Sequence, residues 1–91
     1  MAEPVIKYDI SGHAADEMQR RGLDESIVRQ VLSAPEWRET VRPGRDLLQS
    51  RMELDGEIFL VRVFVDLDRE PAVVVTAYRT SKLQKYWRGQ P

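Results

Sequence analysis

The spacing of hydrophobic residues changes most clearly near Trp37. In residues 11–34, apolar side chains recur at the spacing of one face of an amphipathic helix, and only the short stretch 5–10 before them alternates. From Trp37 onward, apolar and polar residues alternate, which is typical of strands that bury one face. The pattern therefore predicts helices followed by strands, that is, an α+β domain.

The first part of the chain carries the start and stop signals of two helices. Residues 11–22 begin with Ser11, an N-cap residue, and end at Gly22, a natural residue just past a helix C-terminus. A second helix is predicted over residues 24–34, with Asp24 as its N-cap. Because only a short turn separates them, the two segments predict a helical hairpin.

Alternating segments joined by turns fill most of the remaining chain. Asp55-Gly56, between two such segments, is the strongest hairpin signal, and Pro43-Gly44 marks another turn. Strands are predicted at 37–42, 46–54, 57–67 and 72–79, with a short first strand at 5–10 and a last helix at 82–87. The sequence thus predicts one domain over residues 1–91, with a core from about 8 to 87. It contains a helical hairpin, preceded by the short strand, then a four-stranded antiparallel meander and a short C-terminal helix.

The Asp55-Gly56 turn sets the register of the hairpin around it. With a two-residue loop, Leu48 faces Val63 on an apolar face that the helices would cover. On the other face, Arg51 lies beside Leu60, and Gln49 lies beside Arg62. Arg51 and Arg62 become diagonal neighbours, roughly 7 to 8 Å apart.

The next turn decides which residue joins these two arginines. A four-residue loop places Arg79 opposite Leu60, in one row with Arg51 and alongside Arg62. A slip of one residue would put Tyr78 there instead. Three arginines on one sheet face would suit the oxygens of a nucleic-acid backbone, because guanidinium groups bind phosphate bidentately. The alternative is a solvated face on which the arginines pair with Glu53, Asp66 and Gln49.

Composition excludes several classes of protein. The chain has no cysteine and one histidine, which excludes disulfides and thiolate zinc sites. No apolar run reaches the roughly 18 to 20 residues that span a bilayer, and the N-terminus lacks the layout of a signal peptide, so a cytoplasmic protein is expected. No cofactor fingerprint is present. The one alternative is a metal site with oxygen ligands at Asp66 and Asp68. Two carboxylates in a loop bind a metal ion poorly, so no metal or cofactor is predicted.

Charge is distributed unevenly along the chain. The net charge is −1, yet residues 76–91 carry no acid and four bases, Arg79, Lys82, Lys85 and Arg88. The first 75 residues therefore carry a net charge of −5. The C-terminal part can present a local positive field despite the acidic whole.

Two stretches resemble a known family. "HAADEMQRRGL", with His13, Arg21 and Gly22, resembles the opening of a small bacterial and archaeal domain family of unknown function. "VVVTAYRTSKLQKYW" resembles its closing signature. This family is grouped with the RelE/ParE-like toxin superfamily, and the ending is also similar to that of BrnT-type toxins. The resemblance covers about residues 8–87 and implies a sheet with helices packed on one face.

The resemblance also implies a function and a site. Characterised members of the superfamily bind mRNA on the ribosome or a protein target, and an antitoxin covers the same face. The chain is therefore expected to be the toxin-like component of a type II toxin-antitoxin system and a metal-independent mRNA endoribonuclease. Arg79 matches the strand-end arginine of the family, and neighbouring signature positions are matched by Tyr78, Lys82 and Tyr86.

Chemistry assigns tasks to these residues. Metal-free RNA cleavage needs charge on the phosphate stabilised and protons moved at the 2′- and 5′-oxygens. Catalysis is assigned to Arg79, Tyr78 and His13, the one side chain whose ordinary pKa lies near neutrality. The expected phosphate and RNA contacts are Arg51, Arg62, Lys82, Lys85 and Tyr86.

The alternative function is a non-catalytic protein-interaction module of the same fold. Its partner would be an antitoxin-like protein or a second copy of the chain. Such an interface favours aromatic anchors, here Trp37, Phe64, Tyr86 and Trp87.

Overall fold

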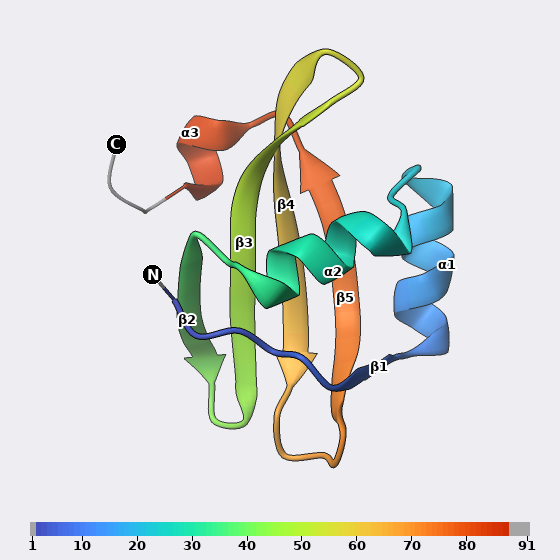
Figure 1. The fold of residues 1–91 in the computed structure, drawn as a ribbon, viewed down its shortest axis with the longest axis vertical. Helices are drawn as coiled ribbons and strands as arrows, with labels where there is room; N and C mark the ends of the chain where they lie inside the picture. Colours follow the sequence, from blue (N-terminus) through green and yellow to red (C-terminus); the bar gives the residue numbers. More distant parts are fainter. Residues whose placement is uncertain (1, 88–91) are drawn as a thin grey trace.

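In this computed structural model, which describes residues 2–87, two helices cover one face of a five-stranded sheet (Figure 1). In chain order the elements are β1 Tyr8–Ile10, α1 Gly12–Arg20, α2 Glu25–Ser33, β2 Trp37–Arg42, β3 Arg45–Leu54, β4 Glu57–Asp66, β5 Ala72–Thr80 and α3 Leu83–Tyr86. The α+β class and the helical hairpin are confirmed. The C-terminal positions 88–91, with Arg88, lie outside the described residues.

The sheet is mixed, and the prediction of a four-stranded antiparallel meander is wrong. Its strand order is β1-β5-β4-β3-β2, with β1 parallel to β5 and every other pair antiparallel. The short segment before the helices is thus an integral edge strand. Turn signals could not show this pairing, because both helices and three strands separate β1 from its partner along the chain.

The two ends of α1 follow their predicted caps, whereas Asp24 occupies the N-cap position of α2 without a side-chain capping hydrogen bond. The Ser11 side-chain oxygen accepts a hydrogen bond from the Ala14 backbone N–H at 3.1 Å. After α1, Gly22 has a φ of +64°, and the Leu23 N–H donates to the Met18 carbonyl at 2.8 Å. These contacts form a Schellman motif, which explains why glycine occupies that position. Among residues 2–87, none of the helices has the length and apolar character needed to cross a bilayer.

The core lies between the sheet and the helices α1 and α2. Leu48, Val63 and Ala77 contribute the central sheet positions, and Val28 and Leu32 contribute from α2; all five are fully buried. Strand residues alternate between faces. Leu60 and Arg62 therefore point away from this core, onto the side of the sheet that is called the far face below.

The β3–β4 register agrees with the prediction throughout. Leu48 faces Val63, Arg51 faces Leu60, and Gln49 faces Arg62. In the connecting turn Asp55 has a φ of +55° and Gly56 a φ of +78°. Positive φ at both central residues is the requirement of a type I′ turn, which Asp-Gly meets at low steric cost.

The β4–β5 register agrees near its turn and then shifts. Val65 faces Val74, as the predicted loop requires, but Phe64 faces Thr76. The extra residue, Val75, is a β-bulge, and it reverses which side chains of the rest of β5 face the far side. Tyr78 consequently lies opposite Arg62.

Candidate functional site

Four side chains from four adjacent strands form a row across the far face. Trp37 of β2 pairs with Gln49 of β3, Gln49 with Arg62 of β4, and Arg62 with Tyr78 of β5. At roughly 4.8 Å between strands, the row spans about 14 Å. The helix α3 lies against the same face, because its Tyr86 ring stacks on Arg62.

Arg62 is the centre of this row and is half-buried. Its Nε donates to Gln49 Oε1 at 3.1 Å, and its Nη1 donates to the Tyr78 hydroxyl at 2.9 Å. Its guanidinium carbon lies 4.4 Å from the centre of the Tyr86 ring and 5.5 Å from that of Phe64. The guanidinium is therefore oriented by neutral polar and aromatic groups.

No carboxylate compensates the charge of Arg62 within residues 2–87, since none of their ion pairs involves it. Other partly buried arginines are paired: Arg38 with Asp46 at 2.8 Å and Arg45 with Asp66 at 2.6 Å. A half-buried cation without a counter-charge is costly in a folded protein. It makes this position a candidate anion site.

Gln49 accepts the hydrogen bond from Arg62 Nε and was not predicted as a site residue. Its side chain is 1% exposed, and its Nε2 has no hydrogen-bond partner among the described residues. Because Arg62 Nε can only donate, the carbonyl oxygen of Gln49 must face it. Gln49 thereby orients the guanidinium. The predicted hairpin register already placed Gln49 opposite Arg62, and this was the signal in the sequence that could have identified it.

Arg51 lies beside the row but is compensated. Its Nη2 is 3.1 Å from Glu36 Oε2, and Glu36 Oε1 accepts from both Nε and the backbone N–H of Arg51. The guanidinium carbon lies 4.4 Å from the centre of the Trp87 ring. The hydrogen bond from the Arg51 side chain lowers the pKa of Glu36 below its ordinary value.

This ion pair predicts acid sensitivity. A carboxyl whose pKa is lowered by folding stabilises the fold fully above its ordinary pKa of 4.5, and that contribution is lost as pH falls through the lower folded pKa. Because Glu36 is 40% exposed, the effect should stay below about 1 kcal/mol. Urea unfolding at pH 7 and pH 3 should show less pH dependence for Glu36→Gln than for the wild type. Equal pH dependence in both proteins would contradict this assignment.

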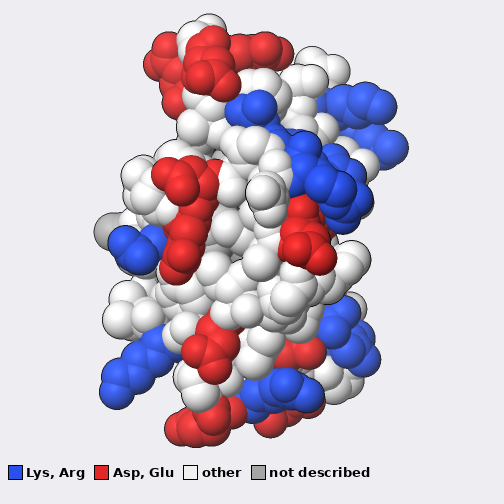
Figure 2. Space-filling view, turned by 90° about the vertical axis from the view of Figure 1, so that its right-hand side faces the viewer, with Lys and Arg blue, Asp and Glu red and all other residues white. Residues whose placement is uncertain are grey.

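Further cations lie around the row. Arg21, just after α1, lies 5.4 Å from the centre of the Tyr78 ring at the β5 end, and Lys85 of α3 lies 5.2 Å from that of Tyr86. Lys82 and Lys85 are both exposed. Figure 2 shows basic side chains along its right-hand edge, which is the side of the far face. No site role was predicted for Arg21, although it belongs to the Arg-Gly opening.

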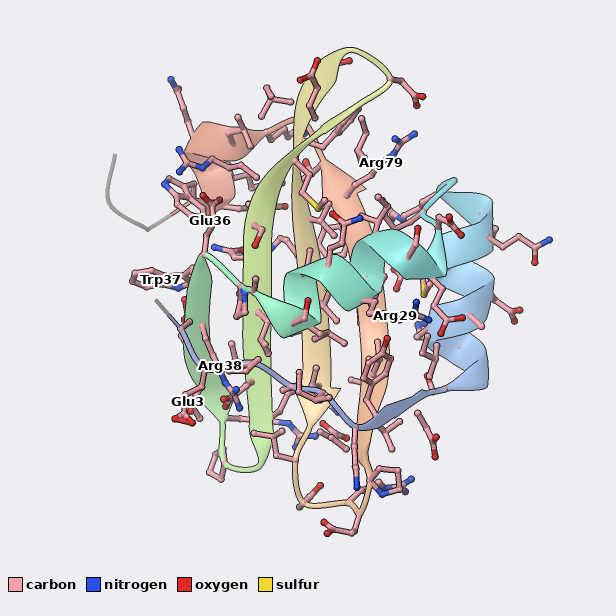
Figure 3. The ribbon with its side chains drawn as sticks, in the orientation of Figure 1. Glu3, Arg29, Glu36, Trp37, Arg38 and Arg79 are labelled. Carbon is pink, nitrogen blue, oxygen red and sulfur yellow. The ribbon has the colours of Figure 1, made fainter. Side chains whose placement is uncertain are left out.

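Arg79 does not belong to this face, and its predicted place beside Arg51 and Arg62 is wrong. The bulge at Val75 places it opposite Val61, on the side of α1 and α2. Its guanidinium lies 4.6 Å from the centre of the Phe59 ring and 3.6 Å from the Asp55 carboxylate. Figure 3 shows Arg79 near the α1–α2 turn, far from Glu36 and Trp37. The Arg79 guanidinium therefore lies between the β3–β4 turn and Gly22 of the α1–α2 turn.

His13 is also separate from the row. It is exposed at the second position of α1, whereas Arg21 follows the last residue of that helix. Eight residues of helix place the two about 12 Å apart along the axis. The predicted catalytic group of Arg79, Tyr78 and His13 is therefore dispersed, and Tyr78 is the member that meets Arg62.

The two candidate metal ligands, Asp66 and Asp68, both lie near Arg45. Arg45 donates to both oxygens of Asp66, at 2.6 and 3.2 Å. This contact lowers the pKa of Asp66. Within the described part of the chain, no group of three or more histidine, aspartate or glutamate side chains is arranged to hold a metal ion.

Together, the fold and the far face define a small α+β domain with a basic and aromatic sheet surface. The chain belongs to the family described as "Domain of unknown function (DUF4258)", whose model matches residues 10–79. No curated protein matches the chain, and no solved structure does.

Proposed function

We propose that this protein is a cytoplasmic, toxin-like RNA-binding component of a type II toxin-antitoxin system, and that the far face binds single-stranded RNA. The observation that carries the proposal is Arg62, a half-buried cation with no carboxylate partner in the described part of the chain, held among the rings of Phe64, Tyr78 and Tyr86. Single-stranded nucleic acids are bound by such combinations of cations and stacking rings.

The hydrogen bonds of Arg62 leave capacity for a phosphate. Two of its five N–H donors contact Gln49 and Tyr78 within the described residues. The Tyr78 hydroxyl accepts from Arg62, so its own proton can be donated to a ligand oxygen. Lys82 and Lys85 would add a longer-range attraction that weakens as salt is added.

The arrangement reassigns the roles in the proposed cleavage. Arg62 takes the phosphate-stabilising role that was expected of Arg79, since it lies on the far face. Tyr78 is the group that we assign to proton transfer, because its hydroxyl is 2.9 Å from Arg62 Nη1. His13 has no part in this scheme. The resemblance of the chain ending to RelE/ParE-like and BrnT-type toxins supports the toxin assignment, with an antitoxin as the partner that covers the far face.

The alternative, a non-catalytic interaction module of the same fold, is favoured by one observation. The three residues expected to act together in catalysis are dispersed over two faces and one helix end. In this alternative, the same aromatic row would contact a protein, either an antitoxin-like neighbour or a second copy of the chain.

Expression in a bacterium separates the two. Wild-type protein should slow growth and shorten mRNA, and Tyr78→Phe should restore growth while RNA binding in vitro is kept. Arg29→Gln, on the exposed side of α2, is a control that should remain toxic. Normal growth and intact mRNA under wild-type expression, with the protein present at the same level, would contradict the toxin assignment and leave the interaction module.

A further inference from the structure

A groove beside the far face is lined by the two tryptophans of the chain. It has a volume of about 700 Å³ and lies between the N-terminal segment, the end of α2, β2 and the residue after α3. Its walls include Pro4, Pro35, Glu36, Trp37, Arg51 and Trp87. This volume is within the usual range of small-molecule sites, and mostly apolar walls with a few polar groups are typical of them.

The walls combine flat rings with a donor and an acceptor. The Arg51 guanidinium lies over the Trp87 ring, and the Glu36 carboxylate holds it by two side-chain hydrogen bonds. Glu36 and Trp37 lie next to each other at the start of β2, below α3 (Figure 3). The walls thus offer two aromatic rings, a guanidinium and a carboxylate.

We infer that this groove binds one nucleobase, stacked between Trp37 and the layer formed by Arg51 and Trp87. The inference rests on the proposed RNA-binding function, because that function supplies the base. Aromatic rings and guanidinium planes are the usual stacking partners of unpaired bases. The Glu36 carboxylate, beside this stacking layer, would accept a hydrogen bond from the polar edge of the base.

Position relative to Arg62 favours a base over a peptide. Arg51 and Arg62 are diagonal neighbours on the far face, roughly 7 to 8 Å apart. A strand with a phosphate on Arg62 can therefore place an adjoining base in the groove. Proline-rich peptides also dock between aromatic rings, but they would make no use of the uncompensated cation nearby.

Intrinsic fluorescence tests the inference directly, since both fluorescent indoles of the chain line the groove. Titration with adenosine, guanosine, cytidine and uridine should give saturable quenching for at least one nucleoside. Trp37→Leu should weaken that binding about fivefold or more, as loss of one stacking ring does. Ala34→Tyr, a change at an exposed wall position, should block it without touching the core. Thermal unfolding verifies that both variants fold.

The outcomes separate this site from the proposed function. Nucleosides lack phosphate, so Arg62→Gln should leave their binding unchanged while it weakens binding of an RNA oligonucleotide. If it leaves oligonucleotide binding unchanged as well, the proposed function fails and the groove assignment stands. Absence of saturable quenching by every nucleoside, or quenching unaffected by Ala34→Tyr, overturns the inference. Binding of decaproline in place of any nucleoside overturns it too.

Discussion

Replacing Arg62 by glutamine should weaken the binding of a single-stranded RNA oligonucleotide by about 10- to 100-fold. A hydrogen-bonded contact with a charged group contributes about 1.5 to 3 kcal/mol, and each 1.4 kcal/mol is a factor of ten. The effect should be large because no carboxylate among residues 2–87 forms an ion pair with this guanidinium. Fluorescence anisotropy at low salt measures the change.

Arg29→Gln is the matched control for this substitution. It removes the same charge from α2, where Arg29 is 65% exposed and 3.7 Å from Glu25. RNA affinity should then change by less than about twofold, because the residue lies on the opposite side of the sheet. Equal losses in the two variants would mean that net charge alone governs binding, and that the far face has no special part.

Replacing Leu48 by alanine should have the largest effect on stability. The side chain is fully buried between β3 and the helices, and Leu→Ala changes at such positions cost about 2 to 5 kcal/mol. A domain of this length has a total stability on the order of 5 to 14 kcal/mol. The midpoint of urea unfolding should therefore fall sharply.

Leu67→Ala provides the comparison for the same chemical change. Leu67 is 38% exposed and lies after the end of β4, so its loss leaves no cavity in the core. Its unfolding midpoint should stay close to that of the wild type. A similar loss of stability in both variants would contradict the placement of the core between the sheet and the helices.

Much of the fold was predictable because local signals specify it. The Asp55-Gly56 turn and strict alternation on both sides determined the β3–β4 register, and the caps at Ser11 and Gly22 determined the extent of α1. The parallel pairing of β1 with β5 was not predictable, because no turn joins the two strands. The hairpin and the helix caps depend on residues close together in the sequence, and such contacts can be recognised in a single sequence. The pairing of β1 with β5 joins distant residues and cannot.

The site was predicted in part, and one residue decided the rest. Arg62 was identified from the hairpin register. The bulge at Val75 lies in a run of β-branched residues where no residue type marks the extra position, so the exchange of Arg79 for Tyr78 could not be assigned. The groove of Trp37 and Trp87 brings together four segments that are distant in sequence. The spacing of hydrophobic residues gives no information on contacts between such distant segments.

The central claim is that the far face is the RNA-binding surface, and an NMR titration tests it most directly. Adding a single-stranded RNA oligonucleotide to isotope-labelled protein should shift the Nε–H signal of Arg62 and the amide signals of Tyr78 and Tyr86. The side-chain signals of His13, Arg29 and Arg79 should stay in place. Shifts confined to the helix side, or no shift at low salt and millimolar RNA, would contradict the claim.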